Sequence, residues 1–356
     1  MKVLHSADWH LDSPLTGRTS EQTELLRGEL LRLPGKVVNA AREENCDLML
    51  LAGDLFDGAY SRQSLDALRN ALEDAAIPVF ITPGNHDPVG SASPWTAESW
   101  PENVHIFTGE SVRSVSLPEL DCRVYGAAFE NTFAPSLLEG FRASQEERYA
   151  VGVLHGDPTR ADSPYCAVSA VQAAESGLDY LALGHIHKRG EFLAGRTLCA
   201  WPGCPMGRGY DETGEKGVLI AELGEAVSCR FLALDTLRFF DLECPAGENP
   251  FAALAAFLPP VGNRDFYRIT LTGESGNVDV DALLAAYCAF PNLELRDRTV
   301  LPLDVWGTAG EDTLEGIYFG LLKASMEGQD EKTAERIALA AKISRKILSG
   351  QEVRLP

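Results

Sequence analysis

Five short segments of the chain combine residue types that bind metal ions with apolar runs typical of buried strands. Each is an apolar stretch that ends in Asp, Asn or His, usually beside glycine: LHSADWH (4–10), LLAGD (50–54), ITPGNHD (81–87), GVLHGD (152–157) and LALGHIH (181–187). In open α/β sheets, functional groups gather at the carboxyl ends of the strands. We therefore expect the five segments to meet at one edge of a sheet.

The metal-binding side chains in these segments exceed the needs of one ion. They are Asp8, His10, Asp54, Asn85, His155, His185 and His187. Imidazole with carboxylate and amide oxygen, and without thiolate, favours Mn²⁺, Fe²⁺ or Zn²⁺ over a closed structural zinc site. Two ions roughly 3.5–4 Å apart that share one carboxylate would use all seven groups. We expect Mn²⁺, with Fe²⁺, Zn²⁺ and Mg²⁺ as alternatives.

The spacing of these residues suggests how they are positioned. Asp8 and His10 are two residues apart, so along an extended segment both side chains would leave the same face. The same holds for His185 and His187. Glycines at 53, 84, 156 and 184 are expected to allow sharp turns and close backbone approach. Each segment alone is compatible with ordinary turn chemistry or with a hydrogen-bonded core histidine, but five together favour one metal site.

Apolar periodicity predicts the elements that must carry these residues. Strands are expected at 2–5, 47–52, 78–82, 149–154 and 179–183, and helices at 21–44 and 61–76, the latter with Ser61 as N-cap. After residue 189 the segments EFLAG, TLCAW, GVLIAEL and VSCRFLAL are β-like. This order favours an α/β sandwich with both faces covered.

The composition changes near residue 237. Three strand-like segments (RFFDLEC, FYRITLTGE and NLELRDRT) and helical stretches near 249–258 and 279–288 indicate a small α+β unit without histidine. Residues 312–349 are expected to form two helices separated at Gly328, the second basic and amphipathic over 331–348. We therefore predict three parts: a catalytic domain at 1–236, an α+β cap at 237–310 and C-terminal helices at 311–356.

Composition narrows the class of protein. No apolar run approaches the ~20 residues of a membrane span, and the first ten residues lack a signal-peptide pattern, so a cytoplasmic protein is expected. The eight cysteines are scattered singly and are expected to be free and mostly buried. With 31 Lys+Arg against 52 Asp+Glu, the formal net charge is −21. A nucleic-acid-binding protein usually carries a basic surface, so a DNA enzyme of this charge would rely on cations or a basic partner.

The pattern D-x-H, G-D, G-N-H-D, H-G-D and G-H-x-H, spread over residues 8–187, resembles the calcineurin-like metallophosphoesterase superfamily. The segments HSADWHLDSP, LLAGDLFDG, TPGNHDP and WPGCPMGRG resemble, more narrowly, the SbcD/YhaO-type DNA repair exonucleases. The resemblance implies a four-layer β-sandwich flanked by helices, with a smaller α+β cap domain and C-terminal helices.

The resemblance also implies roles for site residues. One ion would be held by Asp8, His10, Asp54 and His187, and the other by Asp54, Asn85, His155 and His185. A hydroxide shared by the two ions would attack phosphorus in line. His86 would assist the leaving group. Asp87 would either orient His86 or stabilise the turn.

Several further residues depart from the pattern or have open roles. In archaeal and eukaryotic relatives the third residue after the bridging aspartate is a second catalytic histidine, but here it is Asp57. Arg62 and Arg208 are candidates for binding substrate phosphate, with a solvated surface role as the alternative. Trp95 and Trp100, in the loop after GNHD, either pin that loop or stack on bases.

The function implied is a DNA exonuclease acting in DNA repair with an SMC-like coiled-coil ATPase, on which the C-terminal helices would dock, and with a homodimeric core. Two other functions stay open. The first is a nucleotide or small-molecule phosphodiesterase, which the acidic charge suits at least as well. The second is a scaffold or assembly module with a vestigial site, which the intact ligand set disfavours.

Overall fold

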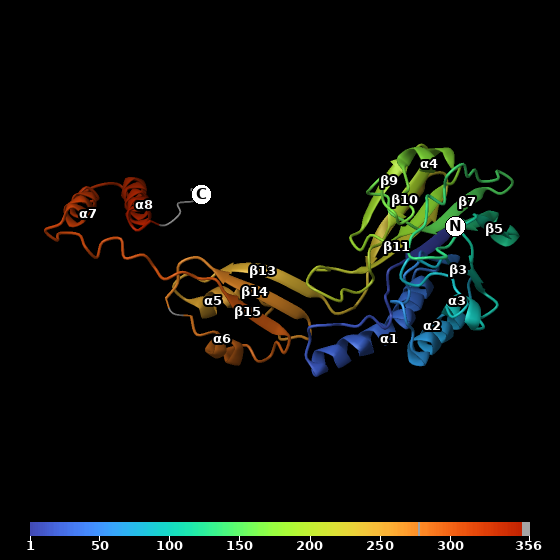
Figure 1. Cartoon of the computed structure of the whole chain (residues 1–356), viewed down its shortest axis with the longest axis horizontal. Coiled ribbons are helices and arrows are strands. Elements are labelled where there is room, and N and C mark those ends of the chain that lie inside the picture. Colours follow the sequence, from blue (N-terminus) through green and yellow to red (C-terminus); the bar gives the residue numbers. More distant parts are fainter. Residues whose placement is uncertain (277, 351–356) are drawn as a thin grey trace. The chain divides into compact units, whose positions relative to one another are not determined.

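The computed structural model describes residues 1–276 and 278–350, and the chain divides into two compact units (Figure 1). The first unit contains Met1–Asp241, Asn263–Arg268 and Phe290–Glu294. The second contains Leu242–Gly262, Ile269–Ala289 and the chain from Leu295 onward. This division by contacts differs from the three-part division expected from the sequence, which stays a prediction.

The strands form three sheets. The first sheet has the order β12-β11-β1-β2-β3-β4, the second β5-β6-β7-β8-β10-β9 and the third β13-β14-β15. The bounds are β1 Lys2–Ser6, β2 Leu48–Leu51, β3 Val79–Ile81, β4 Val104–Ile106, β5 Arg113–Leu117, β6 Cys122–Gly126, β7 Tyr149–His155, β8 Tyr180–Gly184, β9 Gly190–Ala194, β10 Thr197–Trp201, β11 Gly217–Leu223, β12 Val227–Ala233, β13 Phe239–Pro245, β14 Phe266–Thr272 and β15 Leu293–Asp297.

The helices lie between these strands along the chain. Their bounds are α1 Ser20–Glu43, α2 Arg62–Ala75, α3 Pro94–Ala97, η1 Pro118–Leu120, α4 Ala170–Glu175, α5 Pro250–Ala255, α6 Val280–Ala286, α7 Leu314–Ala324 and α8 Glu331–Leu348. Thr19 and Gln22 form a capping box that begins α1, and Ser61 caps α2 as expected. Gly328, with φ of 75°, lies between α7 and α8 where the break was predicted.

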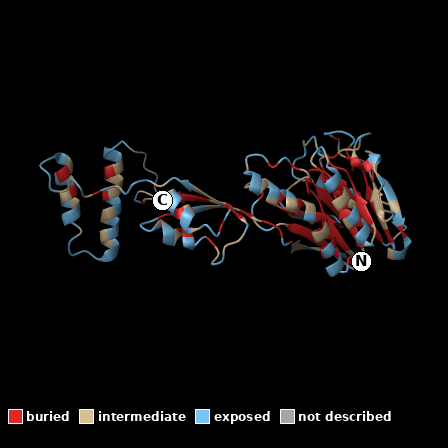
Figure 2. Cartoon of the chain, turned by 90° about the horizontal axis from the view of Figure 1, so that it is seen from below, coloured by how far each residue is buried: buried red, intermediate tan, exposed pale blue. Residues whose placement is uncertain are grey.

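The first two sheets pack face to face, with helices outside, because alternate residues of each central strand point to opposite sides. Val3 of β1 and Leu48 of β2 belong to the core between the sheets, which also contains Val151 of β7. Leu4 and Met49, one residue later in each strand, belong to the core shared with α1 and α2. Figure 2 shows these strands as the most buried part of the first unit. The expected four-layer α/β class is confirmed.

The central strands are parallel, so their carboxyl ends share an edge. β1 pairs in parallel with β2, β2 with β3, and β3 with β4. In the second sheet β6, β7 and β8 are parallel in the same way. The strands expected from apolar runs are present, whereas β4, β5 and β6 were missed. β4 and β5 are short and largely accessible, and β6 (CRVYG), although mostly buried, has its apolar run interrupted by Arg123.

Other expectations concern the chain as a whole. The eight cysteines are free, and all but Cys229 and Cys288 are buried. None of the helices within residues 1–276 and 278–350 is long and apolar enough to cross a membrane.

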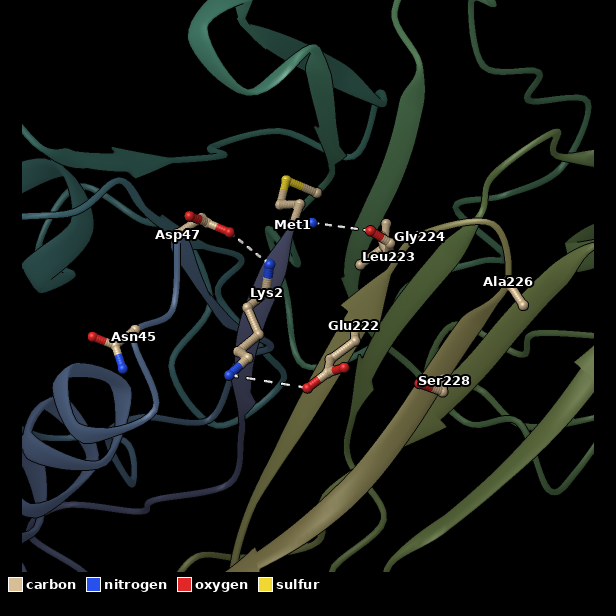
Figure 3. A pocket seen from close by; sticks show the side chains of 9 residues that line it. All are labelled: Met1, Lys2, Asn45, Asp47, Glu222, Leu223, Gly224, Ala226 and Ser228. Carbon is tan, nitrogen blue, oxygen red and sulfur yellow. Dashed lines mark hydrogen bonds and ion pairs between the residues drawn. The ribbon is translucent and has the colours of Figure 1, made fainter.

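A pocket of about 420 Å³ lies at the amino end of β1, where Met1 and Lys2 face Asp47 and Glu222 (Figure 3). It is therefore separated by the length of β1 from the residues that follow that strand.

The second unit has a small core. The expected α5, α6 and the strands of the third sheet are present. α7 and α8 bury Phe319 and Ala341 against Val305 of the preceding segment. Much of their remaining apolar surface is exposed, as Leu314 (88%) and Leu321 (67%) illustrate.

Candidate metal centre

The loops after β1 and β2 run side by side and bring the first ligands together. The backbone N–H of Asp8 donates to the carbonyl of Gly53 (3.0 Å), and that of His10 donates to the carbonyl of Asp54 (2.9 Å). Asp8, His10 and Asp54 all have positive φ, at 57°, 47° and 51°. Such left-handed backbone costs of order 1 kcal/mol or more per non-glycine residue and clusters at functional sites.

This geometry corrects the expected reason for the two-residue spacing. β1 ends at Ser6 and β8 ends at Gly184, so neither pair of ligands lies on an extended strand. His185 also has a positive φ, of 88°. The side chains of each pair reach the site because the backbone turns sharply after the strand, and not because alternate residues of a strand share a face.

Two glycines allow the loops to approach this closely. Gly53 has φ of 85°, and a Cβ there would lie 2.6 Å from Nδ1 of His155. A Cβ at Gly184 would collide with the carbonyl oxygen of Ala52. The predicted role of glycine is therefore a sharp turn at Gly53 and close packing of two backbones at Gly184.

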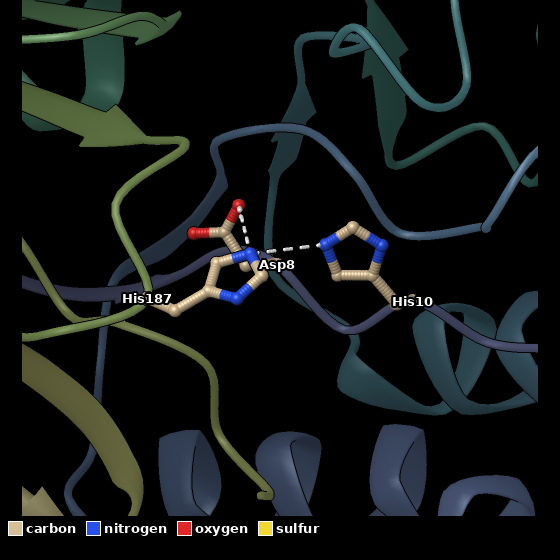
Figure 4. A group of neighbouring side chains, drawn as sticks. All are labelled: Asp8, His10 and His187. Atoms are coloured by element: carbon tan, nitrogen blue, oxygen red, sulfur yellow. Dashed lines mark hydrogen bonds and ion pairs between the residues drawn. The ribbon is translucent and has the colours of Figure 1, made fainter. Parts of the chain in front are cut away.

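One group of potential ligands surrounds His10 (Figure 4). Its Nε2 lies 3.2 Å from Nε2 of His187 and 3.7 Å from Oδ2 of Asp54. Nε2 of His187 lies 3.9 Å from Oδ1 of Asp8. Asp8, His10 and His187 each offer a ligand atom, and these atoms lie within 4.8 Å of one another.

A second group surrounds His155. Its Nδ1 is 2.8 Å from the carbonyl of Ala52, so this nitrogen donates and the lone pair of a neutral ring is on Nε2. That Nε2 lies 3.3 Å from Oδ2 of Asp54 and 2.9 Å from Oδ1 of Asn85. Nδ1 of His185 lies 3.1 Å from the same amide oxygen. Asp54 therefore lies between the two groups.

The donor set fits divalent cations. Acceptor atoms of seven side chains converge, and Asp8, Asp54 and His155 are almost completely buried. Nδ1 of His10 is buried without a hydrogen-bond partner among the described residues. Burial opposes the charged form of His155, but the charge of Asp54 outweighs it and raises the pKa to about 9. A cation between these groups would take the place of that proton.

His86 lies beside the ligands and is half-exposed. Its Nδ1 is 2.7 Å from Oδ1 of Asp57, and its backbone N–H donates to Oδ1 of Asp54 (2.8 Å). The hydrogen bond to Asp57 raises the pKa of His86 against the effect of burial. The carboxylate at position 57 therefore orients His86.

Asp87 stabilises the turn, which is the second of the two roles expected for it. Its buried carboxylate accepts hydrogen bonds from the backbone N–H groups of Asp54 (3.1 Å), Leu55 (2.8 Å) and Gly84 (2.7 Å). It thereby ties the loop after β2 to the loop after β3. The expectation that Asp87 orients His86 is wrong, because Asp57 occupies that position against the ring.

Glu212 is a site residue that the sequence analysis missed. Its Oε1 accepts a hydrogen bond from Nδ1 of His187 (2.7 Å) and another from Nη2 of Arg208 (2.6 Å). Burial alone would raise the pKa of Glu212, but these two partners hold it below its ordinary value. Metal-binding histidines commonly donate their second ring nitrogen to a carboxylate. The only sequence signal was its position four residues after Arg208 in GRGYDE.

The two arginines expected as candidates for binding phosphate differ in their positions, and only one of them lies at the site. Arg208 lies at the site: its Nη2 is 3.3 Å from Nδ1 of His187, and a cavity of about 290 Å³ adjoins it. Arg62 is exposed at the start of α2 and pairs with Asp66 (3.2 Å) and Glu98 (3.1 Å). Its partners are thus surface carboxylates, and nothing in the described residues brings it to the ligands.

The two tryptophans pin the loop after β3. Trp95 is 4% exposed, and its Nε1 donates to the carbonyl of Asp87 (2.7 Å). Trp100 stacks on it with ring centroids 5.3 Å apart and donates to the carbonyl of Pro94 (3.0 Å). Neither arrangement leaves Trp95 open to a base.

Comparison with known proteins agrees with this geometry. The family model described as calcineurin-like phosphoesterase matches residues 1–189, which include all seven ligand candidates. The chain belongs to this family. A metallophosphoesterase of Bacillus subtilis named YhaO is 34% identical over 241 residues, covering 63% of this chain and 57% of the relative. The SbcD component of the SbcCD nuclease of the same organism is 28% identical over 268 residues, covering 62% of this chain and 66% of the relative.

The chain therefore spans less than two thirds of the length of either relative. Among solved structures, a dimetal phosphatase from Danio rerio has 13% identity and a TM-score of 0.42, covering 66% of this chain and 96% of that one. The family match covers the part of the chain in which the candidate metal ligands lie together.

Proposed function

We propose that this protein is a two-metal phosphodiesterase that acts as a DNA exonuclease in DNA repair, together with an SMC-like ATPase. The observation that supports this chemistry is the convergence of the seven ligand side chains in two groups with Asp54 between them, and with His86 at their edge. The observation that supports DNA as substrate is the similarity to the SbcD component of the SbcCD nuclease.

The ligands divide between two ions. Asp8, His10 and His187 would hold one, Asn85, His155 and His185 would hold the other, and Asp54 would contact both. When bound, the ions supply Lewis acidity at the phosphoryl oxygens and an activated water as nucleophile. We propose manganese as the ion.

His86 supplies the proton in this scheme. Since Asp57 raises its pKa, the ring is more readily protonated near neutral pH than an isolated histidine. Its side chain is 47% exposed, so a substrate can reach it. A protonated His86 would donate its Nε2 proton to the leaving oxygen as the phosphorus–oxygen bond breaks.

Arg208 is suited to orient substrate from a fixed position, because its side chain is not free to move. Its guanidinium is already held by Glu212, and 14% of its side chain is exposed. The charge stays on the guanidinium and lies beside the metal centre, so Arg208 would stabilise a phosphate oxygen without leaving its partner.

The partner is argued from the second unit. α7 and α8 expose Leu314, Leu321 and Ile347, and a pocket of about 490 Å³ lies between the two helices. Exposed apolar surface of this kind marks sites of protein association. We propose that this surface contacts the ATPase, which would also supply the positive charge that a chain of net charge −21 lacks. A homodimeric core and a cytoplasmic location are part of the same proposal.

The acidic charge favours a second candidate, a nucleotide or small-molecule phosphodiesterase. Electrostatic repulsion of a polyanion is larger than repulsion of a single nucleotide, so −21 suits the smaller substrate. The same metal centre serves both reactions.

One experiment separates these candidates. The protein is incubated with end-labelled single- and double-stranded DNA, with cyclic nucleotides and with bis-p-nitrophenyl phosphate, in Mn²⁺ and in Mg²⁺. The nuclease proposal expects progressive shortening of DNA from its ends in Mn²⁺ that Asp54→Asn abolishes. Hydrolysis of the small substrates without DNA degradation, even with the ATPase present, would favour the second candidate. If Asp54→Asn left cellular DNA repair unchanged, only a scaffold role would remain.

A further inference from the structure

Two aromatic side chains form a short ladder from the metal centre toward the surface. The ring centroid of Tyr165 lies 4.9 Å from that of His185, with an interplanar angle of 36°. The centroid of Phe133 lies 5.4 Å from that of Tyr165, at 37°. Tyr165 is half-buried and Phe133 is 59% exposed. The outer ring therefore presents apolar surface close to a proposed metal ligand.

The backbone holds this ladder in place. The N–H of Ala134 donates to the carbonyl of Pro164 (3.1 Å), and the N–H of Cys166 donates to the carbonyl of Ala134 (2.9 Å). The N–H of Asp157 donates to the carbonyl of Tyr165 (3.1 Å), which connects the ladder to the HGD segment. Ala134 and Cys166 are buried. The aromatic residues are thus mounted on fixed backbone, which lowers the entropy lost when a ligand stacks on them.

Exposure of Phe133 is not explained by packing within the chain. Trp95 and Trp100, the aromatic residues after the GNHD motif, stack on each other and donate both indole N–H groups to carbonyls. The side chain of Phe133 has no polar atom that could form a hydrogen bond with water. Most of its surface is nevertheless exposed to solvent, near the side of the metal centre on which His185 lies. A flat apolar ligand would cover it.

Charge does not account for binding at this loop. Between Pro158 and Tyr165 the charged residues are Arg160 and Asp162, which lie 3.4 Å apart. They form an exposed ion pair, so this segment adds no net positive charge. A ligand held here is held by ring contact.

We propose that Phe133 and Tyr165 form a stacking platform for the nucleobase of the nucleotide whose phosphodiester is cleaved. Every base has a π-face, so stacking on aromatic side chains tolerates any sequence. A base within a duplex is covered on both faces by its neighbours, whereas a terminal or unpaired base has a free face. The platform therefore favours unpaired ends as substrate. This inference rests on the proposed phosphodiesterase function, and it applies to nucleic acid and to single nucleotides.

The test compares two esters with the same leaving group. Thymidine 5′-(p-nitrophenyl phosphate) carries a base, and methyl p-nitrophenyl phosphate does not. The wild type is expected to have the lower KM for the thymidine ester. Phe133→Ala is expected to raise that KM about 5- to 150-fold, which corresponds to the contribution of one stacked base, and to leave kcat and the methyl ester unaffected.

Two further variants separate stacking from structure. Phe133→Leu keeps apolar bulk without a π-face and is expected to share most of the loss. Phe251→Ala removes an exposed phenylalanine (44%) from the second unit and is expected to change nothing. Quenching of a terminal 2-aminopurine in an oligonucleotide gives an independent measure of stacking and should weaken in Phe133→Ala but not in Phe251→Ala.

The outcomes distinguish this inference from the proposed nuclease function. Equal KM values for both esters in the wild type, or an equal effect of Phe133→Ala on both, would overturn the platform. If DNA is not degraded but the thymidine preference is lost in Phe133→Ala, the platform stands and the nuclease proposal fails. If DNA is degraded and Phe133→Ala has no effect on the thymidine ester, the nuclease proposal stands and the platform fails.

Discussion

The two compact units differ in which side chains they keep from water. The first buries charge: Asp8, Asp54 and His155 are each 0–1% exposed. The second exposes apolar surface: Leu314, Leu321 and Ile347 are 61–88% exposed, while its C-terminal helices bury a small core around Phe319. Burying charge is costly unless a counter-charge compensates, and exposing contiguous apolar surface is costly unless a partner covers it.

We infer that each unit is completed by a different kind of ligand. The first unit needs cations, and we infer that the second needs a protein. Changes to the metal centre should therefore act on the first unit alone, and changes to the exposed face of α7 should act on association alone.

The largest expected effect comes from His86→Ala. Loss of the proton donor should lower kcat on bis-p-nitrophenyl phosphate by about 10²–10⁴-fold, because His86 is proposed as general acid. Metal content, measured by atomic emission, should stay at the wild-type value, since His86 is not among the proposed ligands. A variant that lost both metal and activity would place His86 in the ligand set instead.

Removal of divalent ions should destabilise the first unit and spare the second. Ions at 100 times their Kd stabilise a folded state by about 2.7 kcal/mol. Hydrogen exchange after treatment with EDTA is expected to rise in the loops after β1, β2 and β8 and to be unchanged in α7 and α8. Equal change in both units would contradict their independence.

Glu212→Gln should weaken metal binding without unfolding the chain. Loss of a carboxylate that orients a ligand histidine costs about 10–100-fold in metal affinity. Titration with Mn²⁺ in a calorimeter measures this, and Asp211→Asn, at the neighbouring exposed position, is the matched control. If Glu212→Gln bound Mn²⁺ as the wild type does, His187 would not depend on this carboxylate.

Acid should destabilise the first unit through His5. Burial lowers its pKa from 6.5 to about 3, so the folded chain keeps the ring neutral while the unfolded chain takes up a proton. The contribution of neutral His5 to the free energy of unfolding is fully present above pH 6.5. It is lost as the pH falls toward 3, by about 1.4 kcal/mol per pH unit. Urea unfolding of His5→Gln should show a shallower pH dependence than the wild type over this range. The same slope in both proteins would rule out His5 as the source.

The smallest effect on stability is expected from Leu321→Ser. This side chain is 67% exposed, and surface substitutions usually change stability within about 0.5 kcal/mol. Phe319→Ala, at a fully buried position two residues away, should cost about 3 kcal/mol or more. In pull-down with the ATPase, Leu321→Ser should lose association while its phosphodiesterase activity is unchanged. Retained association would remove this face from the proposed interface.

The sequence predicted the fold class and the convergence of the ligands because both depend on local patterns. Apolar runs that end in Asp, Asn or His are visible in a single sequence, and parallel strands share their carboxyl edge. Ser61 as N-cap and the break at Gly328 were predicted for the same local reasons.

The features of the site that the sequence did not predict depend on contacts between residues far apart in the chain or on the backbone of a neighbouring loop. Asp57 meets His86 across 29 positions and Glu212 meets His187 across 25, and no pattern of spacing identifies such pairs. Asp87 lies beside His86 in the sequence, yet its carboxylate turns to the backbone of the loop after β2. The left-handed backbone of Asp8 and His10 is likewise imposed by the neighbouring loop.

The order of the ligands along the chain has a consequence for biosynthesis. Asp8 leaves the ribosome first, but its site needs His187 and the supporting Glu212, and β1 also pairs with β11, which follows them. At typical synthesis rates the delay is on the order of tens of seconds. During that time β1 has one edge uncovered, and Asp8 and Asp54 have His10 beside them but lack the later histidines His185 and His187. The nascent chain is therefore expected to acquire metal only late in translation, when β11 has emerged.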